Sequence, residues 1–163
     1  MTFRITSTAF VLLLLVMTRG VANPQTDMDG LREAAAHAAA EWVDKKQPGM
    51  GRQLAAEVGI SEAAGNRIIA QMRLDQARCA INSWKEAPDD LEASLLRRLV
   101  AGIDVADDPT DYGAQVIQSM IDRGYSQDDL RDINSWAEDY YSSCIREGER
   151  LYMKRLEDAV RGG

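Results

Sequence analysis

Apolar side chains recur every three or four positions along most of the chain, which is the spacing of one face of an α-helix. Helix-forming residues dominate after position 22, and the strict alternation typical of strands is absent over any useful length. The pattern predicts helices over 29–46, 52–58, 61–87, 88–102, 111–124 and 126–160. The sequence therefore predicts an all-α fold, a single-domain helical bundle of five or six helices.

The last predicted helix is also the longest. Ser126 and Asp129 form a capping box at its start, with Asp129 in place of the usual Glu or Gln. Its apolar stripe consists of Leu130, Ile133, Ala137, Tyr140, Cys144 and Leu151. A stripe at this spacing predicts that the helix faces the core along its length.

The N-terminal segment, 1–22, has the layout of a secretory signal peptide. Arg4 precedes an uninterrupted apolar run, Ala9–Met17, and the small residues Gly20-Val21-Ala22 follow. A membrane-spanning helix needs about 20 apolar residues, so this run is too short. We therefore expect a signal peptide over 1–22 and a helical domain over 23–163, exported to the periplasm or secreted, with no membrane span. The alternative is an apolar N-terminal core helix.

Net charge narrows the classes of partner. The chain has 19 basic and 26 acidic side chains, and loss of Arg4 and Arg19 with the leader leaves a net charge of −9. A surface this acidic repels nucleic acid and anionic lipid. At 163 residues and 45% apolar content the chain is large enough for one hydrophobic core.

The two cysteines are expected to pair. Cys79 and Cys144 lie far apart in the sequence and fall on two long predicted helices. In an oxidising compartment two thiols of one small domain usually form a disulfide. A redox pair favours a Cys-x-x-Cys arrangement at a helix start, which these positions lack. Two buried free thiols are the other alternative.

Candidate chemistry is sparse elsewhere. Glu33, His37 and Glu41 share one helical face, where they can form a metal site, a proton-transfer pair or a solvated row of ion pairs. The surrounding alanines build no pocket, so we favour the solvated row of ion pairs.

The acidic segment with Asp104, Asp107, Asp108 and Asp111 lacks the spacing and glycine of an EF-hand loop. We interpret it as a loop whose final Asp111 caps the next helix. We assign no catalytic, cofactor-binding or metal-binding residue.

Residues 54–68 resemble the helix-turn-helix of bacterial DNA-binding proteins. The resemblance rests on the alanines of Leu54–Ser61, the turn glycine Gly59, the apolar Ile60 after it and Ile68. It implies a DNA-reading second helix, but it departs at Gly65, where that family usually has an aliphatic residue. Because the domain is acidic, we interpret the segment as two helices that meet at a glycine turn.

One four-residue sequence occurs twice, in two different predicted helices. Ile-Asn-Ser-Trp occurs at 81–84 and again at 133–136, with a glutamate two places later in each copy. The flanking residues match poorly, so coincidence is favoured over a duplicated helical hairpin.

Three aromatic residues suggest a surface for a partner. Trp136, Tyr141 and Tyr152 lie partly off the apolar stripe and beside acids, as residues of a protein-contact surface do. The alternative is a helix packed from two sides. Together with export and acidity, this predicts a non-enzymatic binding protein, of inhibitor, immunity or accessory type, for a basic protein partner. A carrier of an apolar ligand and a carboxylate-based hydrolase are the alternatives.

Overall fold

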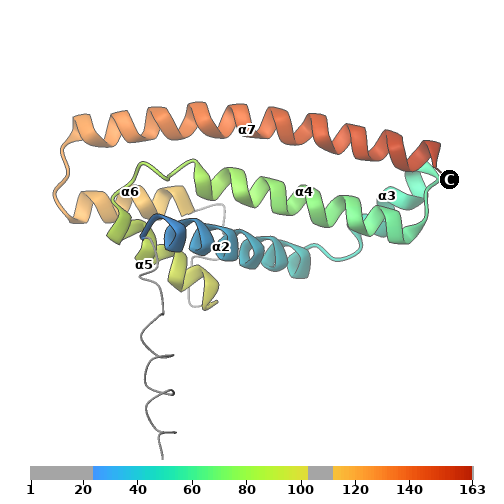
Figure 1. Ribbon diagram of the computed structural model, residues 1–163, viewed down its shortest axis with the longest axis horizontal. Helices are drawn as coiled ribbons and strands as arrows, with labels where there is room; N and C mark the ends of the chain where they lie inside the picture. The colour runs from blue at the N-terminus through green and yellow to red at the C-terminus, as the bar shows by residue number, and fades with distance from the viewer. Residues whose placement is uncertain (1–23, 103–111, 163) are drawn as a thin grey trace, which may run out of the picture.

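The computed structural model describes residues 24–102 and 112–162, which form six α-helices and no strand (Figure 1). These helices are α2 (Pro24–Lys46), α3 (Met50–Val58), α4 (Glu62–Asn82), α5 (Asp89–Val100), α6 (Tyr112–Asp122) and α7 (Gln127–Arg161). The predicted all-α bundle is thereby confirmed. The signal peptide predicted over 1–22 and the acidic segment, with its cap Asp111, lie outside the described residues. No described helix combines the length and the apolar character needed to span a bilayer.

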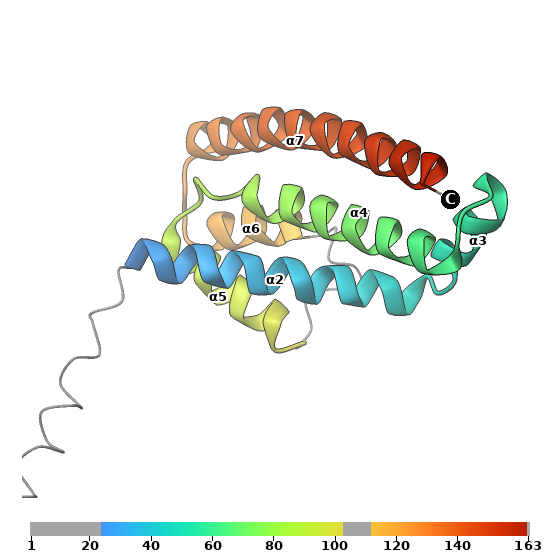
Figure 2. The same cartoon turned by 45° about the vertical axis from the view of Figure 1, so that its right-hand side comes forward.

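Three long helices lie side by side and set the shape of the molecule. In both views α4 lies between α2 and α7 (Figures 1 and 2). The shorter α5 packs against α2, and α6 contacts α5, α4 and α7. The short α3 packs against α4 near its start. The bundle therefore has α4 at its centre, with its shorter helices grouped around the two ends.

The prediction for the third helix extends too far at the C-terminal end. The sequence predicts that it continues to Ala87, but α4 ends at Asn82. The Ser83 hydroxyl donates a hydrogen bond of 2.8 Å to the Ala80 carbonyl oxygen, and residues 83–86 form a turn. A serine that bonds a nearby carbonyl competes with the helical ladder, and Pro88 disfavours a helix at the residue before it.

The start of α4 follows the expected glycine turn. Gly59 has a φ of 73°, which glycine adopts freely, and the Ser61 side chain accepts a hydrogen bond of 3.2 Å from the Ala64 amide. A Cβ on Gly65 would lie 2.2 Å from the Gly51 carbonyl oxygen. The missing side chain at position 65 therefore lets α3 and α4 pack backbone against backbone.

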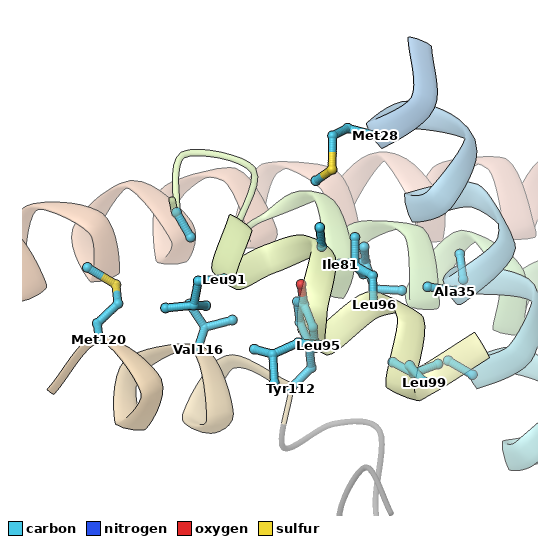
Figure 3. Packing of buried hydrophobic residues seen from close by; sticks show 14 residues of the cluster. Met28, Ala35, Ile81, Leu91, Leu95, Leu96, Leu99, Tyr112, Val116 and Met120 are labelled. Atoms are coloured by element: carbon cyan, nitrogen blue, oxygen red, sulfur yellow. The ribbon is translucent and has the colours of Figure 1, made fainter. Parts of the chain in front are cut away.

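The hydrophobic core lies between α2, α5 and α6 (Figure 3). Its largest fully buried apolar residues are Leu91, Leu96, Tyr112, Val116 and Met120. Alanines of α2 and Ile81 of α4 close it on the other sides. These side chains interdigitate at the end of the bundle where α5 and α6 cover the long helices.

The apolar stripe of α7 is less buried than predicted. Within α7 only Ala137 is buried, at 3% exposure, whereas Tyr140, Cys144 and Leu151 are partly exposed. The physical reason is that α7 packs mainly against one neighbour, α4, and contacts α6 only near its start.

A buried ion pair links α2 to α5. Arg32 donates two hydrogen bonds to the Glu92 carboxylate, at 2.8 and 2.7 Å, and the two residues are 6% and 0% exposed. The phenol oxygen of Tyr112 is also buried, and it has no hydrogen-bond partner among the described residues. Burial, assisted by the Glu92 charge, raises the pKa of the Tyr112 phenol above its ordinary value.

Candidate functional site

The structure joins Cys79 of α4 to Cys144 of α7, as the sequence predicts. The two sulfur atoms are 2.04 Å apart and the Cα atoms 5.6 Å apart. Cys79 is 2% exposed and Cys144 is partly exposed. Because few α7 side chains are buried, this disulfide holds the helix in a fixed register against α4.

The three aromatic residues predicted to face a partner do not form one surface. Tyr141 and Tyr152 are separated by about three full turns, so they lie on the same side of α7. Tyr152 lines a small hollow with Met72 and Cys79 of α4. Trp136 lies about 140° around the helix from Tyr141, by the usual rotation of about 100° per residue. The structure therefore places Trp136 on a different side of α7 from the two tyrosines.

Trp136 instead forms a cluster with two residues that the sequence pattern does not assign to the site. Its ring stacks on that of Tyr140, with centroids 5.1 Å apart and planes 24° from parallel. The Lys85 Nζ lies 5.3 Å from the Trp136 ring centroid and 5.4 Å from that of Tyr140. An ammonium over an aromatic face is attracted by the negative charge of the π-system.

Local geometry explains how this cluster forms. Trp136 and Tyr140 are one helical turn apart, so their side chains project from the same side of α7. Lys85 lies in the turn that follows α4, shortly after Cys79, whereas Tyr140 comes one turn before Cys144. The disulfide thus sets the position of α7 at which its aromatic pair meets the Lys85 turn.

Carboxylates surround the aromatic pair. Asp132 lies one helical turn before Trp136, and Asp139 one turn after it, on the same side of α7. Both are exposed, the side chain of Asp132 by 80%. Glu86, beside Lys85, is exposed as well. We call this surface the acidic aromatic face; it comprises Lys85, Glu86, Asp132, Trp136, Asp139 and Tyr140.

Two members of this face differ from what the sequence predicts. Apolar periodicity predicts Tyr140 in the core stripe, although its spacing from Trp136 is a signal for the stacked pair. No local signal identifies Lys85, because its contact depends on the register between α4 and α7. The repeated Ile-Asn-Ser-Trp segments also differ in structure: Asn82 ends α4, whereas Asn134 lies inside α7. Their tryptophans therefore have different surroundings.

Of the residues Glu33, His37 and Glu41 on α2, Glu33 contacts both His37 and Arg78. His37 Nε2 lies 3.1 Å from Glu33 Oε1, while the Arg78 Nε donates a hydrogen bond of 2.9 Å to Glu33 Oε2. The hydrogen bonds from Arg78 lower the pKa of the Glu33 carboxyl. Glu41 and His37 line an open hollow of about 650 Å³ between α2 and α4. Arg78 thus already occupies the Glu33 carboxylate, which a metal ion would need as a ligand.

Aromatic ring faces and carboxylates both favour positive charge. On this face the two rings carry the Lys85 ammonium, and Asp132 lies 3.9 Å from the Arg131 Nε. In the described ranges, 24–102 and 112–162, no group of three or more His, Cys, Asp or Glu side chains is placed to hold a metal ion. Comparison with known protein families, curated proteins and solved structures gives no match to this chain.

Proposed function

We propose that this protein is an exported, non-enzymatic binding protein that recognises a basic protein partner through the acidic aromatic face. One observation carries the proposal. The Lys85 ammonium lies over two stacked rings, Trp136 and Tyr140, on a surface lined by exposed carboxylates. Lysine and arginine side chains of a partner would find the same chemistry there.

Export is supported by two features. Segment 1–22 has the pattern of a signal peptide, and Cys79 and Cys144 form a disulfide of the kind that persists outside the reducing cytosol. A net charge of −9 after removal of the leader suits a basic partner in that compartment, because opposite charges speed the encounter of two proteins.

The aromatic pair would provide the affinity. Tryptophan and tyrosine are enriched among the residues that dominate binding energy at protein interfaces. A cation over an aromatic ring contributes roughly 0.5–1 kcal/mol when exposed and about 2 kcal/mol when an interface excludes water. We expect an arginine side chain of the partner to displace the exposed Lys85 ammonium from the Trp136 ring, with Asp139 as its counter-ion and Asp132 shared with Arg131.

The test compares two variants of the face with controls elsewhere on the chain. The mature domain, residues 23–163, is used to capture proteins of the exported fraction of its own cells, at low and at moderate salt. Trp136→Ala and the double variant Asp132→Asn/Asp139→Asn should each reduce recovery of the captured protein at least tenfold. Higher salt should also weaken capture of a basic partner.

The matched controls lie outside the face. Tyr125→Ala removes an exposed aromatic ring from the turn between α6 and α7, and Glu157→Gln/Asp158→Asn removes two charges near the end of α7. These controls should retain capture. Equal recovery with the face variants and the controls, or a captured partner that is acidic, would contradict the proposal.

A further inference from the structure

Lys85 covers the two rings of the acidic aromatic face in the free protein. Its Nζ lies 5.3 Å from the Trp136 ring centroid and 5.4 Å from that of Tyr140, and it pairs with no described carboxylate. A lysine stem shields apolar surface from water while its ammonium stays hydrated. The place that a partner's cation would take on these rings is therefore filled by a cation of the same chain.

The backbone that carries Lys85 is held in place. The Trp84 amide donates a hydrogen bond of 3.1 Å to the Ile81 carbonyl oxygen, and the Ala87 amide donates one of 2.9 Å to the Trp84 carbonyl oxygen. The Trp84 ring lies against Gly113 of α6, where a Cβ would come within 2.6 Å of the Trp84 Cζ2 atom. Lys85 thus extends from a fixed turn, and its flexible four-carbon stem can leave the rings without a movement of the backbone.

The contact therefore has a closed state, with Lys85 on the rings, and an open state, with Lys85 in water. The rings stay in place because Trp136 and Tyr140 are half-buried and flank Ala137, the one described residue of α7 that is buried. For an exposed cation–π contact, the closed state outnumbers the open state about two- to fivefold. A cation from outside binds only the open state, so its apparent affinity is lowered about three- to sixfold.

We propose that Lys85 is an intramolecular competitor that keeps the Trp136–Tyr140 pair closed until a partner presents arginine. A lysine of the partner would replace one ammonium by another. A guanidinium is planar and less strongly hydrated, so it stacks on the ring, and its fork of N–H groups fits the carboxylate of Asp139. The inference rests on the proposed function for the natural partner, whereas the competition is a property of the free face.

The experiment follows the Lys85 side chain and the Trp136 indole N–H by NMR. Two peptides of equal charge, one of four Arg-Gly repeats and one of four Lys-Gly repeats, are titrated into the domain 23–163 at low salt. In the free protein the ε-methylene protons of Lys85 should lie upfield of those of the exposed Lys45 and Lys154, because they lie over aromatic rings. The arginine peptide should bind at least threefold tighter than the lysine peptide. At saturation it should move the Lys85 signal to the position of the other two.

Substitutions at Lys85 separate competition from simple charge. Lys85→Ala should strengthen both peptides by the same factor, about three- to sixfold, because both lose the same competitor. Lys85→Arg keeps the charge but places a cation that stacks better on the rings, so it should weaken both peptides. Lys46→Ala is the matched control, since the Lys46 Nζ lies 5.3 Å from the Trp42 ring centroid on α2, outside the face. It should change neither affinity by more than twofold.

The outcomes distinguish this inference from the proposed function. Equal peptide affinities in the wild type and folded Lys85→Ala would overturn the competitor, and so would a Lys85 signal that stays upfield at saturation with the arginine peptide. Lys85→Arg binding as tightly as the wild type would leave only a charge effect and refute it as well. Peptides that follow the expected order, with no basic protein captured from the exported fraction, would support the competitor and contradict the proposed partner. Absence of saturable binding of the arginine peptide would overturn both.

Discussion

Arg32 of α2 and Glu92 of α5 form a two-bond ion pair inside the hydrophobic core, 60 residues apart in sequence and almost without contact with water. Two charges so far from solvent are stable only together, because each satisfies the other's hydrogen-bonding groups. The pair therefore fixes how α5 sits on α2, and it has consequences for stability.

Replacement of one member should be far more costly than replacement of both. Glu92→Ala leaves a buried guanidinium without its main partner, so we expect a loss of about 3–5 kcal/mol in the free energy of unfolding. The double variant Arg32→Met/Glu92→Leu should recover most of that loss. Chemical denaturation of the three proteins measures the difference, and a double variant as unstable as Glu92→Ala would contradict this explanation.

The crossing of α3 and α4 has no room for a methyl group at position 65. In Gly65→Ala the new Cβ would meet the Gly51 carbonyl oxygen, and the helices must separate, at a cost of about 1–3 kcal/mol. Gly30→Ala is the control, since its Cβ meets nothing within 4 Å inside α2. That control should raise stability by up to about 1 kcal/mol, because alanine favours helix. Thermal unfolding should therefore shift in opposite directions for the two variants.

The capping box at the start of α7 makes a pH-dependent contribution to stability. The Asp129 carboxylate accepts hydrogen bonds from the Ser126 hydroxyl, at 2.6 Å, and the Ser126 amide, at 3.1 Å, which lower the pKa of Asp129. Since the folded pKa lies below the unfolded one, the contribution is present above the unfolded pKa. It is lost as pH falls through the folded value.

Substitution of the cap should restore the ordinary titration of the carboxyl group. In Ser126→Ala the pKa of Asp129 should rise toward its ordinary value of 3.8, because the hydroxyl donor is gone. A carbon-detected NMR titration of side-chain carboxyls measures this directly. The stability difference between the wild type and Ser126→Ala should also shrink in acid. An unchanged Asp129 titration would show that the hydroxyl does not hold the carboxylate.

Loss of the disulfide should destabilise the protein and loosen α7 in particular. Cross-linking two positions at a sequence separation of 65 contributes about 4 kcal/mol by the chain-entropy model, so Cys79→Ser/Cys144→Ser should unfold at a lower denaturant concentration. Amide hydrogen exchange should rise most in α7 after Cys144, where no described residue is buried. Exchange that rises equally in α2 would argue against this local role.

The sequence predicts the fold class and the approximate position of every described helix. Apolar periodicity and the breakers Pro48, Gly59 and Pro88 are local signals, and local signals decide where helices start and stop. The exact end of α4 is harder to predict, because residues 83–86 combine a serine that bonds the Ala80 carbonyl, five residues before Pro88, with backbone turn bonds such as that from the Trp84 amide to the Ile81 carbonyl oxygen.

The candidate site is less predictable. The Cys79–Cys144 disulfide can be predicted because the chain has two cysteines and a segment typical of exported proteins. The Trp136–Tyr140 pair can be inferred because the two residues are four positions apart in a predicted helix. Lys85 cannot, since its place over the rings requires the register of α4 against α7, two helices far apart along the chain. The Arg32–Glu92 ion pair could not be predicted for the same reason. It depends on how α5 packs on α2, and the sequence around neither residue indicates that packing.

Cys144 is the central residue of α7, with equal lengths of helix on either side of it. The disulfide therefore attaches α7, a helix about 50 Å long, to α4 at its midpoint. Motion of the C-terminal half of α7, up to Arg161, is transmitted through Cys144 to Cys79 of α4. With the disulfide intact, only the half of α7 after Cys144 extends beyond the last covalent link to the rest of the protein. After chemical reduction, the whole of α7 extends beyond the α6–α7 turn without such a link, so the unsupported length is about twice as great and the helix bends away from α4 more easily.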